Sequence, residues 1–341
     1  MKVLVTGGAG YIGSHTVAKL LEKGYEVVVY DNLSTGFATA IPQAAQFVHG
    51  DIRDKNLLVA TLQTNNIEAV VHFAAKLVVA DSVQHPYTYY ENNVSGSLSL
   101  LQACWESDVH KIVFSSTAAV YGDAPKQGIV DELAPTAPLN SYGQSKLTVE
   151  KILEDGRRAY GLNYVILRYF NVAGASVNGS NGLRSKNASH IVKVTAEAAA
   201  GRRKEVQVYG TDYPTPDGTC IRDYIHVEDL ADLHALSLAY LAKGGTSEIM
   251  NCGYGEGSSV LEVIEAMKRT SGTDFVVKYS GRRAGDAIQL VADPAKIHRI
   301  LGWKPKRADL DLICKTAFDW EKKFKPIQNS TVFPGALGIN G

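Results

Sequence analysis

The sequence predicts an α/β protein with a Rossmann-type, doubly wound parallel sheet and a smaller C-terminal α/β substrate domain. Two observations predict this fold. Short apolar runs alternate with helical segments over about 170 residues, which is the rhythm of successive βα units. Glycines at positions 7, 10 and 13 follow the first apolar run, and Asp31 ends the second. A strand, a glycine turn, a helix and a second strand that ends in an acid are typical of a dinucleotide-binding unit.

The elements of the first half follow one another without long loops. Strands are expected at 2–6, 26–30, 46–48, 69–73, 111–114 and 164–167. Helices are expected from the glycine turn to about 23, at 55–65, at 86–107 and from about Tyr142 to Tyr160. Ser141 is a good N-cap for the last of these helices.

The second half is less regular, and a small-residue loop covers 173–187. Further helices are expected at 189–200, 228–242, 259–269, 293–301 and 309–324, and short strands at 206–209 and 223–227. Ser259 and Glu262 have the spacing of a capping box. We expect an NAD-binding domain at 1–170, a substrate domain at 171–325 with returns to the main sheet, and a disordered tail at 326–341.

Composition narrows the classes of function. Lys+Arg and Asp+Glu both number 35 in 341 residues, so no basic face suggests nucleic acid as a partner. The four cysteines are widely spaced and form no CxxC pair, which argues against a zinc site or a disulfide framework. We therefore expect no metal. The chain opens directly on the first strand, so neither a signal peptide nor a membrane span is expected, and the cytoplasm is the expected location.

The glycine turn predicts the cofactor. Gly7, Gly10 and Gly13 allow a tight turn, a close approach to a pyrophosphate and close packing of the helix on the sheet. Free N–H groups at the start of that helix bind phosphate oxygens. Asp31 lies 18 residues after Gly13, where a carboxylate binds an adenosine ribose diol and repels a 2′-phosphate. NAD is therefore expected rather than NADP.

Tyr142 and Lys146 are the predicted centre of the chemistry. Their spacing places both side chains on one face of a helix. A phenol titrates at a pH of about 10, and one unit of pKa shift corresponds to about 1.4 kcal/mol. One positive charge at ~5 Å supplies roughly 3 kcal/mol at an effective dielectric constant of ~20. That is about two units, so a general base at neutral pH needs a second cation, which an oxidised nicotinamide ring would provide.

Ligands of doubly wound sheets lie beyond the carboxyl ends of the strands. Several candidate residues fall at those ends in the predicted elements: Asp31, Asp51, Ala74, Thr117 and Phe170.

The motif TGGAGYIG, the YxxxK pair and the hydroxyl of Thr117 together resemble the extended short-chain dehydrogenase/reductase family. The blocks GGAGYIGSHT, YDNLS, GDIRD, HFAA, YYENNVSG, FSSTAAVYG, LRYFNVAGA and DGTCIRDYIHVEDLA are similar to those of its UDP-glucose 4-epimerase branch. The resemblance implies a UDP-sugar substrate, NAD and a homodimer formed through the helices at 86–107 and 142–160. It also implies that Tyr142 exchanges a proton with the sugar 4′-hydroxyl, Lys146 holds the nicotinamide ribose and Thr117 bonds the reacting oxygen.

The same resemblance implies further contacts. Matching cofactor positions are Tyr11, Ile12, Asp31, Asn32, Asp51, Ile52, Phe73, Ala74, Ala75, Asn92 and Phe170. Matching substrate positions are Asn171, His190, Tyr209, Arg222, Arg283, Asp286 and Leu290. Core packing is the alternative for Tyr209, and surface solvation the alternative for Arg283.

Two positions depart from some relatives. Lys76-Leu77 stands where these have leucine and then lysine, so a lysine contact to the cofactor ribose is in doubt. Leu290 replaces a tyrosine beside the sugar, which implies room for UDP-N-acetylhexosamines. Ala118 and Ala119 offer no acid for elimination chemistry. A 4-epimerase of UDP-glucuronate or of a UDP-pentose, and a non-catalytic dinucleotide sensor, remain as alternatives.

Overall fold

The computed structural model describes residues 1–122, 128–185, 189–283 and 286–324. The predicted tail at 326–341 lies outside these residues, as do the last residues of the predicted loop at 173–187. Within the described ranges, no helix is long and apolar enough to cross a membrane.

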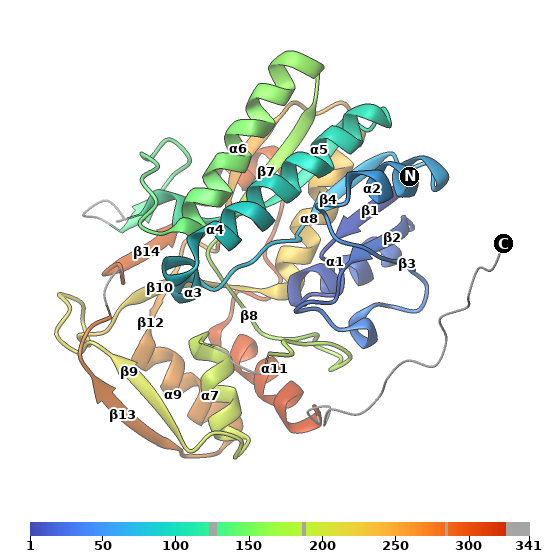
Figure 1. Cartoon of the computed structure of the whole chain (residues 1–341). Coiled ribbons are helices and arrows are strands. Elements are labelled where there is room, and N and C mark those ends of the chain that lie inside the picture. Colours follow the sequence, from blue (N-terminus) through green and yellow to red (C-terminus); the bar gives the residue numbers. More distant parts are fainter. Residues whose placement is uncertain (123–127, 186–188, 284–285, 325–341) are drawn as a thin grey trace.

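A seven-stranded parallel sheet forms the centre of the molecule (Figure 1). In spatial order its strands are β11 (Glu248–Cys252), β7 (Asn163–Tyr169), β5 (Lys111–Thr117), β4 (Ala69–His72), β1 (Lys2–Thr6), β2 (Glu26–Asp31) and β3 (Gln46–His49). The chain builds outward from β1 to β3 and then crosses to β4 on the other side of β1. The doubly wound fold is thereby confirmed, and the crevice for a ligand lies where the order reverses, beyond β1 and β4.

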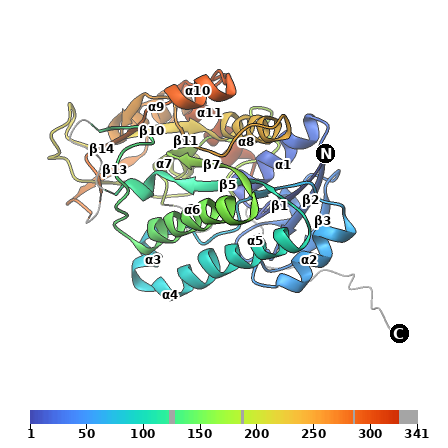
Figure 2. The ribbon, with the colours of Figure 1, turned by 90° about the horizontal axis from the view of Figure 1, so that it is seen from above.

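Helices cover both faces of this sheet (Figure 2). On one face lie α1 (Tyr11–Glu22) and α8 (Val227–Ala242), and on the other lie α2 (Lys55–Thr64), α5 (Gly96–Glu106) and α6 (Ser141–Tyr160). Side chains of a strand alternate between the faces. Val3 and Val5 accordingly pack in the core with α1 and α8, whereas Leu4 packs in the core with α2, α5 and α6.

Three local predictions need correction. The single helix expected at 86–107 is α4 (Pro86–Tyr89), a π-helical turn (Tyr90–Ser95) and then α5. A helix that was not predicted, α3 (Val79–Gln84), precedes them. The N-cap of α6 is Asn140 and not Ser141, because the Asn140 side chain accepts a 2.9 Å hydrogen bond from the N–H of Gly143. Asparagine and serine are nearly equal as N-caps, so local preference could not separate them.

The remaining elements form a smaller unit below the sheet. Helices α7 (Ile191–Ala199), α9 (Val260–Ser271) and α11 (Leu310–Lys323) share an apolar core. The rest are the strands β6 (Ile129–Val130), β8 (Asn171–Ala173), β9 (Glu205–Tyr209), β10 (Ile221–His226), β12 (Gly257–Ser259), β13 (Val276–Ser280) and β14 (Gln289–Ala292). Helix α10 (Ala295–Leu301) belongs instead to the main sheet, because its Ile297 packs in the core with α1 and α8. The predicted capping box of α9 is confirmed, since Ser259 and Glu262 bond one another's backbone N–H groups.

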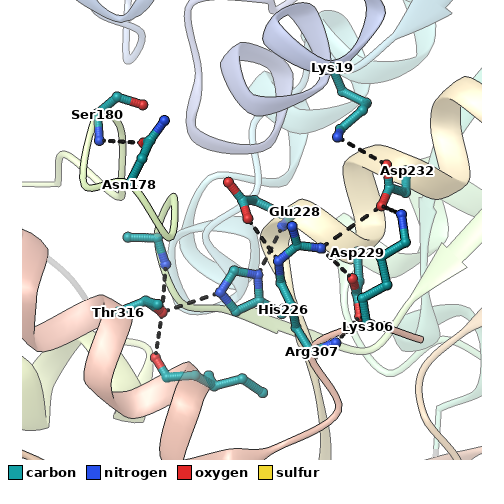
Figure 3. Close-up of polar contacts among 12 residues, drawn as sticks. Lys19, Asn178, Ser180, His226, Glu228, Asp229, Asp232, Lys306, Arg307 and Thr316 are labelled. Atoms are coloured by element: carbon teal, nitrogen blue, oxygen red, sulfur yellow. Dashed lines mark hydrogen bonds and ion pairs between the residues drawn. The ribbon is translucent and has the colours of Figure 1, made fainter. Parts of the chain in front are cut away.

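Polar contacts join the two units (Figure 3). His226 is the N-cap of α8, which covers the main sheet, and its ring lies 3.2 Å from the Thr316 hydroxyl of α11 in the smaller unit. Arg307, in the segment before α11, pairs with the buried Asp229 of α8 at 2.8 Å. These contacts fix the smaller unit below the carboxyl edge of the sheet, where both units face the crevice.

Candidate active site

The glycine turn is packed so closely that it excludes side chains. A Cβ on Gly7 would lie 2.6 Å from the Ala74 nitrogen, and one on Gly13 would lie 2.3 Å from the Gly7 carbonyl oxygen. Gly7 has a φ of +72°, which favours glycine. Gly10 is the N-cap of α1 and has no side chain to occupy the helix start, so no side chain caps the first N–H groups of the helix, which begins with Tyr11 and Ile12. This is a cradle for an anionic group.

Asp31 lies beside that turn, at the end of β2. Its carboxylate is buried and accepts hydrogen bonds from the N–H groups of Ala9 at 3.0 Å and Leu33 at 2.8 Å. Burial raises the pKa of Asp31, against those two hydrogen bonds. The carboxylate is therefore held in one place at the edge of β1 and β2, where the ribose of a dinucleotide would reach it.

Asn32 and Asp51 come together although 19 residues separate them, because β2 and β3 are neighbours. The Asn32 amide donates a 3.0 Å hydrogen bond to Asp51, and Arg53 pairs with the same carboxylate at 2.9 Å. Arg53 holds the pKa of Asp51 well below its usual range. Ile52, next in the chain, is buried in the core.

The loop after β4 carries Phe73, Ala74 and Ala75 and is held by Asn93. The Asn93 amide bonds both the N–H and the carbonyl of Lys76, at 2.8 and 3.0 Å, and the Ser145 hydroxyl on α6 at 2.9 Å. Asn92, the predicted contact, donates to Asn93 at 3.0 Å. Asn93 was missed, although it belongs to the same Asn-Asn pair in the sequence.

Tyr142, Lys146 and Thr117 converge beyond the end of β5. Burial raises the pKa of the Tyr142 phenol, and the nearby Thr117 hydroxyl lowers it by less. The Lys146 ammonium is buried and donates a 2.8 Å hydrogen bond to the Ser115 carbonyl. Burial lowers the pKa of Lys146 to about 7, against the charge of Glu150, which raises it. The phenol is therefore neutral at pH 7 unless further positive charge approaches it.

An apolar wall stands beside this group. Phe170 packs in one cluster with Ala118 and Leu290. Leu290 lies opposite Arg222 in the register of β14 and β10, and Asn171 lies opposite Tyr224 in that of β8 and β10. Four of the predicted contacts, Phe170, Asn171, Arg222 and Leu290, are therefore placed by one small group of strands.

Three predicted substrate residues meet in the smaller unit. The Arg283 guanidinium lies 4.9 Å from the centre of the Tyr209 ring and pairs with Asp286 at 2.9 Å. His190 precedes α7 and lines a narrow cavity of about 20 Å³ together with Tyr11.

The described residues fit an extended dinucleotide: a close-packed glycine turn, an open helix start and a buried acid lie in sequence along one edge. Among these residues, no group of three His, Cys, Asp or Glu side chains could hold a metal ion.

Comparisons with known proteins agree with this geometry. Residues 3–253 match the model of the NAD dependent epimerase/dehydratase family. The chain is 49% identical over 334 residues to a UDP-glucose 4-epimerase of Azospirillum brasilense, covering 98% of this chain and 96% of that one. It superposes with a TM-score of 0.91 and 45% identity on a UDP-glucose 4-epimerase from Brucella ovis in complex with NAD, covering 94% and 98% of the two chains. A UDP-Glc/GlcNAc 4-epimerase from Campylobacter jejuni gives a TM-score of 0.83 and 47% identity over 95% and 99%.

Proposed function

The chain belongs to the NAD dependent epimerase/dehydratase family, and on this basis we propose that it is a UDP-hexose 4-epimerase that interconverts UDP-glucose and UDP-galactose. The observation that carries the proposal is the convergence of Tyr142, Lys146 and Thr117 at the same carboxyl edge of the sheet as the glycine turn. A bare dinucleotide sensor would have no use for a phenol, a hydroxyl and an ammonium grouped at the end of β5.

Each of the three side chains has a part in the proposed reaction. Bound NAD supplies the acceptor, and then the donor, of the hydride at C4′. Tyr142 takes the proton of the 4′-hydroxyl and returns it to the 4-keto sugar, while Thr117 orients the reacting oxygen. Lys146 contributes positive charge beside the phenol. Because burial raises the pKa of Tyr142, the phenolate needs this charge together with that of the oxidised nicotinamide ring.

The rest of the proposed site has a charged part, which would bind the nucleotide end of the substrate, and an apolar part, which would face the sugar. Arg222, Arg283 and Asp286 provide charged groups for the diphosphate and the nucleoside, and guanidinium suits a diphosphate well. The wall of Phe170 and Leu290 beside the phenol is apolar. A sugar held at its nucleotide end and facing such a wall is free to turn, as epimerisation requires. Asn171, His190 and Tyr209 are assigned to the nucleotide-sugar side as well.

The experiment that tests the function uses the protein as purified. It is incubated, with no added cofactor, with UDP-glucose, UDP-galactose, their N-acetyl forms, UDP-glucuronate and a UDP-pentose, and the products are resolved by chromatography. Conversion of UDP-galactose to UDP-glucose is expected. Turnover of only the uronate or the pentose would select that alternative instead, and no turnover of any of them would leave the sensor.

UDP-N-acetylhexosamines are a second proposed substrate class. Leucine at position 290 is shorter than the tyrosine it replaces and lies in the wall beside the site. One of the similar solved structures is that of a UDP-Glc/GlcNAc 4-epimerase from Campylobacter jejuni. This supports a site with room for an N-acetyl group.

We also propose a homodimer in the cytoplasm. Trp105 on α5 and Tyr160 at the end of α6 are about half exposed, and their ring centroids lie 4.7 Å apart. Such a paired aromatic surface on two adjacent helices favours burial by a second copy.

The four cysteines are free and buried, in keeping with a reducing compartment. We retain the proposed division at residue 170, and count α8 and β11 with the NAD-binding part.

A further inference from the structure

A buried ion pair lies one helical turn behind Lys146. Glu150 on α6 and Arg168 on β7 are each less than 5% exposed. They form a two-pronged contact, with Arg168 Nη2 and Nε at 2.6 and 3.0 Å from the two carboxylate oxygens. A buried pair of this kind gives little net stability, because desolvation of both charges offsets their attraction. Its place in the fold therefore needs another explanation.

The pair belongs to a polar row across three strands. Ser116 of β5 is the register partner of Arg168 in β7, and Asn251 of β11 is the partner of Arg168 on its other side. One step earlier along the same face, the row consists of Phe114, Ile166 and Ile249. The core thus changes from apolar to polar at the edge of the sheet that carries the candidate site.

Glu150 joins this row to the residues of the site. Its Oε1 accepts a 2.5 Å hydrogen bond from the Ser116 hydroxyl. Ser116 stands between Ser115, whose carbonyl accepts the hydrogen bond from Lys146, and Thr117, whose hydroxyl lies near the Tyr142 phenol. Fixing Ser116 therefore fixes both neighbours, and with them the distance between the ammonium and the phenol.

The far end of the row is anchored as firmly. Arg168 Nη1 donates to the Tyr121 hydroxyl at 2.9 Å, and that hydroxyl donates to Asn251 at 2.7 Å. The Asn251 amide donates to the Val130 carbonyl at 2.8 Å. The chain of contacts leaves Glu150 no freedom to turn toward solvent.

The geometry points to Glu150 as a positioning residue of the reaction: through Ser116 it sets the strand end that carries Thr117 and the acceptor of Lys146, and it places a negative charge one helical turn from that lysine. The inference rests on the proposed function, because it concerns the same phenol and ammonium. Neither Glu150 nor Arg168 is among the contacts assigned above.

Charges and titrating groups around Lys146 favour this role. On its own helix it has Tyr142 and Glu150, on β7 Arg168 and Tyr169, and on β4 His72, whose pKa burial lowers to about 3. His72 is therefore neutral, and among the described residues Glu150 is the carboxylate that raises the pKa of Lys146 against its burial. Without that charge, the ammonium loses its proton at a lower pH.

Three variants of the holoenzyme test the inference through kcat for UDP-galactose, measured at saturation from about pH 6 to about pH 9. Glu150→Gln keeps the shape of the side chain but removes its charge. We expect the basic limb of the kcat profile to move down by about one pH unit. Ser116→Ala keeps every charge and removes one hydrogen bond. We expect kcat to fall by about threefold to tenfold, with KM and bound NAD unchanged.

Asp229→Asn is the matched control. It neutralises another fully buried carboxylate that pairs with an arginine, Arg307, on the opposite face of the sheet (Figure 3). We expect a lower melting temperature and an unmoved pH profile. If Glu150→Gln does not fold, Ser116→Ala alone decides. A basic limb that stays in place in Glu150→Gln, or a wild-type kcat in Ser116→Ala, overturns the inference. A wild-type protein that epimerises no UDP-hexose overturns the proposed function instead.

Discussion

Lys146 Nζ lies 2.8 Å from the carbonyl oxygen of Ser115, so strand β5, and not the phenol of Tyr142, holds the ammonium in place. The phenol lies near the Thr117 hydroxyl, at the end of the same strand. The phenol and the ammonium are therefore both placed by one short piece of backbone. This arrangement lets each side chain be removed separately, with different expected results.

Tyr142→Phe is expected to lower kcat by at least about a thousandfold, because general acid–base groups contribute factors of this order. The variant keeps the ring that packs beside the crevice, so the fraction of protein with bound NAD should stay at the wild-type value. Absorbance of the released cofactor measures that fraction. Tyr87→Phe is the control, since that side chain is 87% exposed. Substantial activity in Tyr142→Phe would remove the phenol from the mechanism.

Gly13→Ala is expected to release NAD and to lower the melting temperature. The added Cβ would lie 2.3 Å from the Gly7 carbonyl oxygen, which is backbone and has little room to move. Forcing such a contact costs about 1–3 kcal/mol and shifts the helix start that faces the phosphates. Gly281→Ala, where no atom lies within 4 Å of the new Cβ, should match wild type. NAD retained through gel filtration by both variants would contradict this prediction.

Stability is expected to fall steeply below pH 6.5, because four buried histidines are neutral in the fold. Burial lowers the pKa of His15 and His234 to about 4 and that of His72 and His226 to about 3. An unfolded histidine has a pKa of about 6.5, so below that pH the unfolded state binds more protons. Each histidine then costs about 1.4 kcal/mol per pH unit.

From pH 7 to pH 5 the four together cost roughly 7 kcal/mol, which is comparable with the whole stability of a typical domain. Urea unfolding midpoints at pH 7, 6 and 5 should therefore drop sharply. His72→Asn should reduce the slope of stability against pH, whereas His85→Asn, at an exposed site, should leave it unchanged. A stability that is flat over this range would show that the histidines are charged in the fold.

Leu290→Tyr is expected to lower kcat/KM for UDP-N-acetylglucosamine by more than about tenfold, with UDP-glucose affected much less, because the larger ring fills the space beside the site. Leu290→Gly should retain the N-acetyl activity. Chromatography of both sugar nucleotides against their 4-epimers gives the ratio. Equal inactivity of wild type and Leu290→Gly on UDP-N-acetylglucosamine would end this proposal.

Sedimentation velocity is expected to find a dimer, and Trp105→Glu to find a monomer that still binds NAD. The charged side chain would have to be buried against the partner without a counter-ion. Phe47→Glu is the control, because Phe47 is 38% exposed on the edge strand β3 and away from α5. A wild-type monomer refutes the dimer.

Helices and strands were predictable where the pattern of apolar residues was clear and turn residues marked the ends. The strands from β1 to β5 are short apolar runs ended by turns, and each was placed within a few residues. β11 was not predicted, because Glu248–Cys252 has five residues with a polar Asn251 near its end. Residues 248–252 form a strand because their backbone pairs with β7, where Arg168 lies opposite Asn251. The π-helical turn leaves no mark in a helical pattern of apolar residues.

The sequence indicated the side chains proposed to react, but it did not indicate the long-range contacts that hold them in place. Spacing on one helix predicted that Tyr142 and Lys146 are neighbours. Tyr209 and Arg283 were each assigned to the substrate by resemblance, and no signal in the sequence indicated that these two side chains meet. Glu150 was missed because a glutamate on a helix normally faces water, and nothing local indicates a buried arginine on a strand 18 residues later.

The last strand of the main sheet, β11, comes from residues 248–252, long after the glycine turn and the phenol have been translated. Until β11 has left the ribosome, β7 is an edge strand whose unpaired backbone N–H and C=O groups can pair with strands of other chains. A fragment that ends at residue 170 would keep nearly all the proposed cofactor contacts, but it would lack β11, which pairs with β7, and α8, which covers one face of the sheet. We therefore expect such a fragment to aggregate, and the nascent chain to depend on chaperones until synthesis has passed β11.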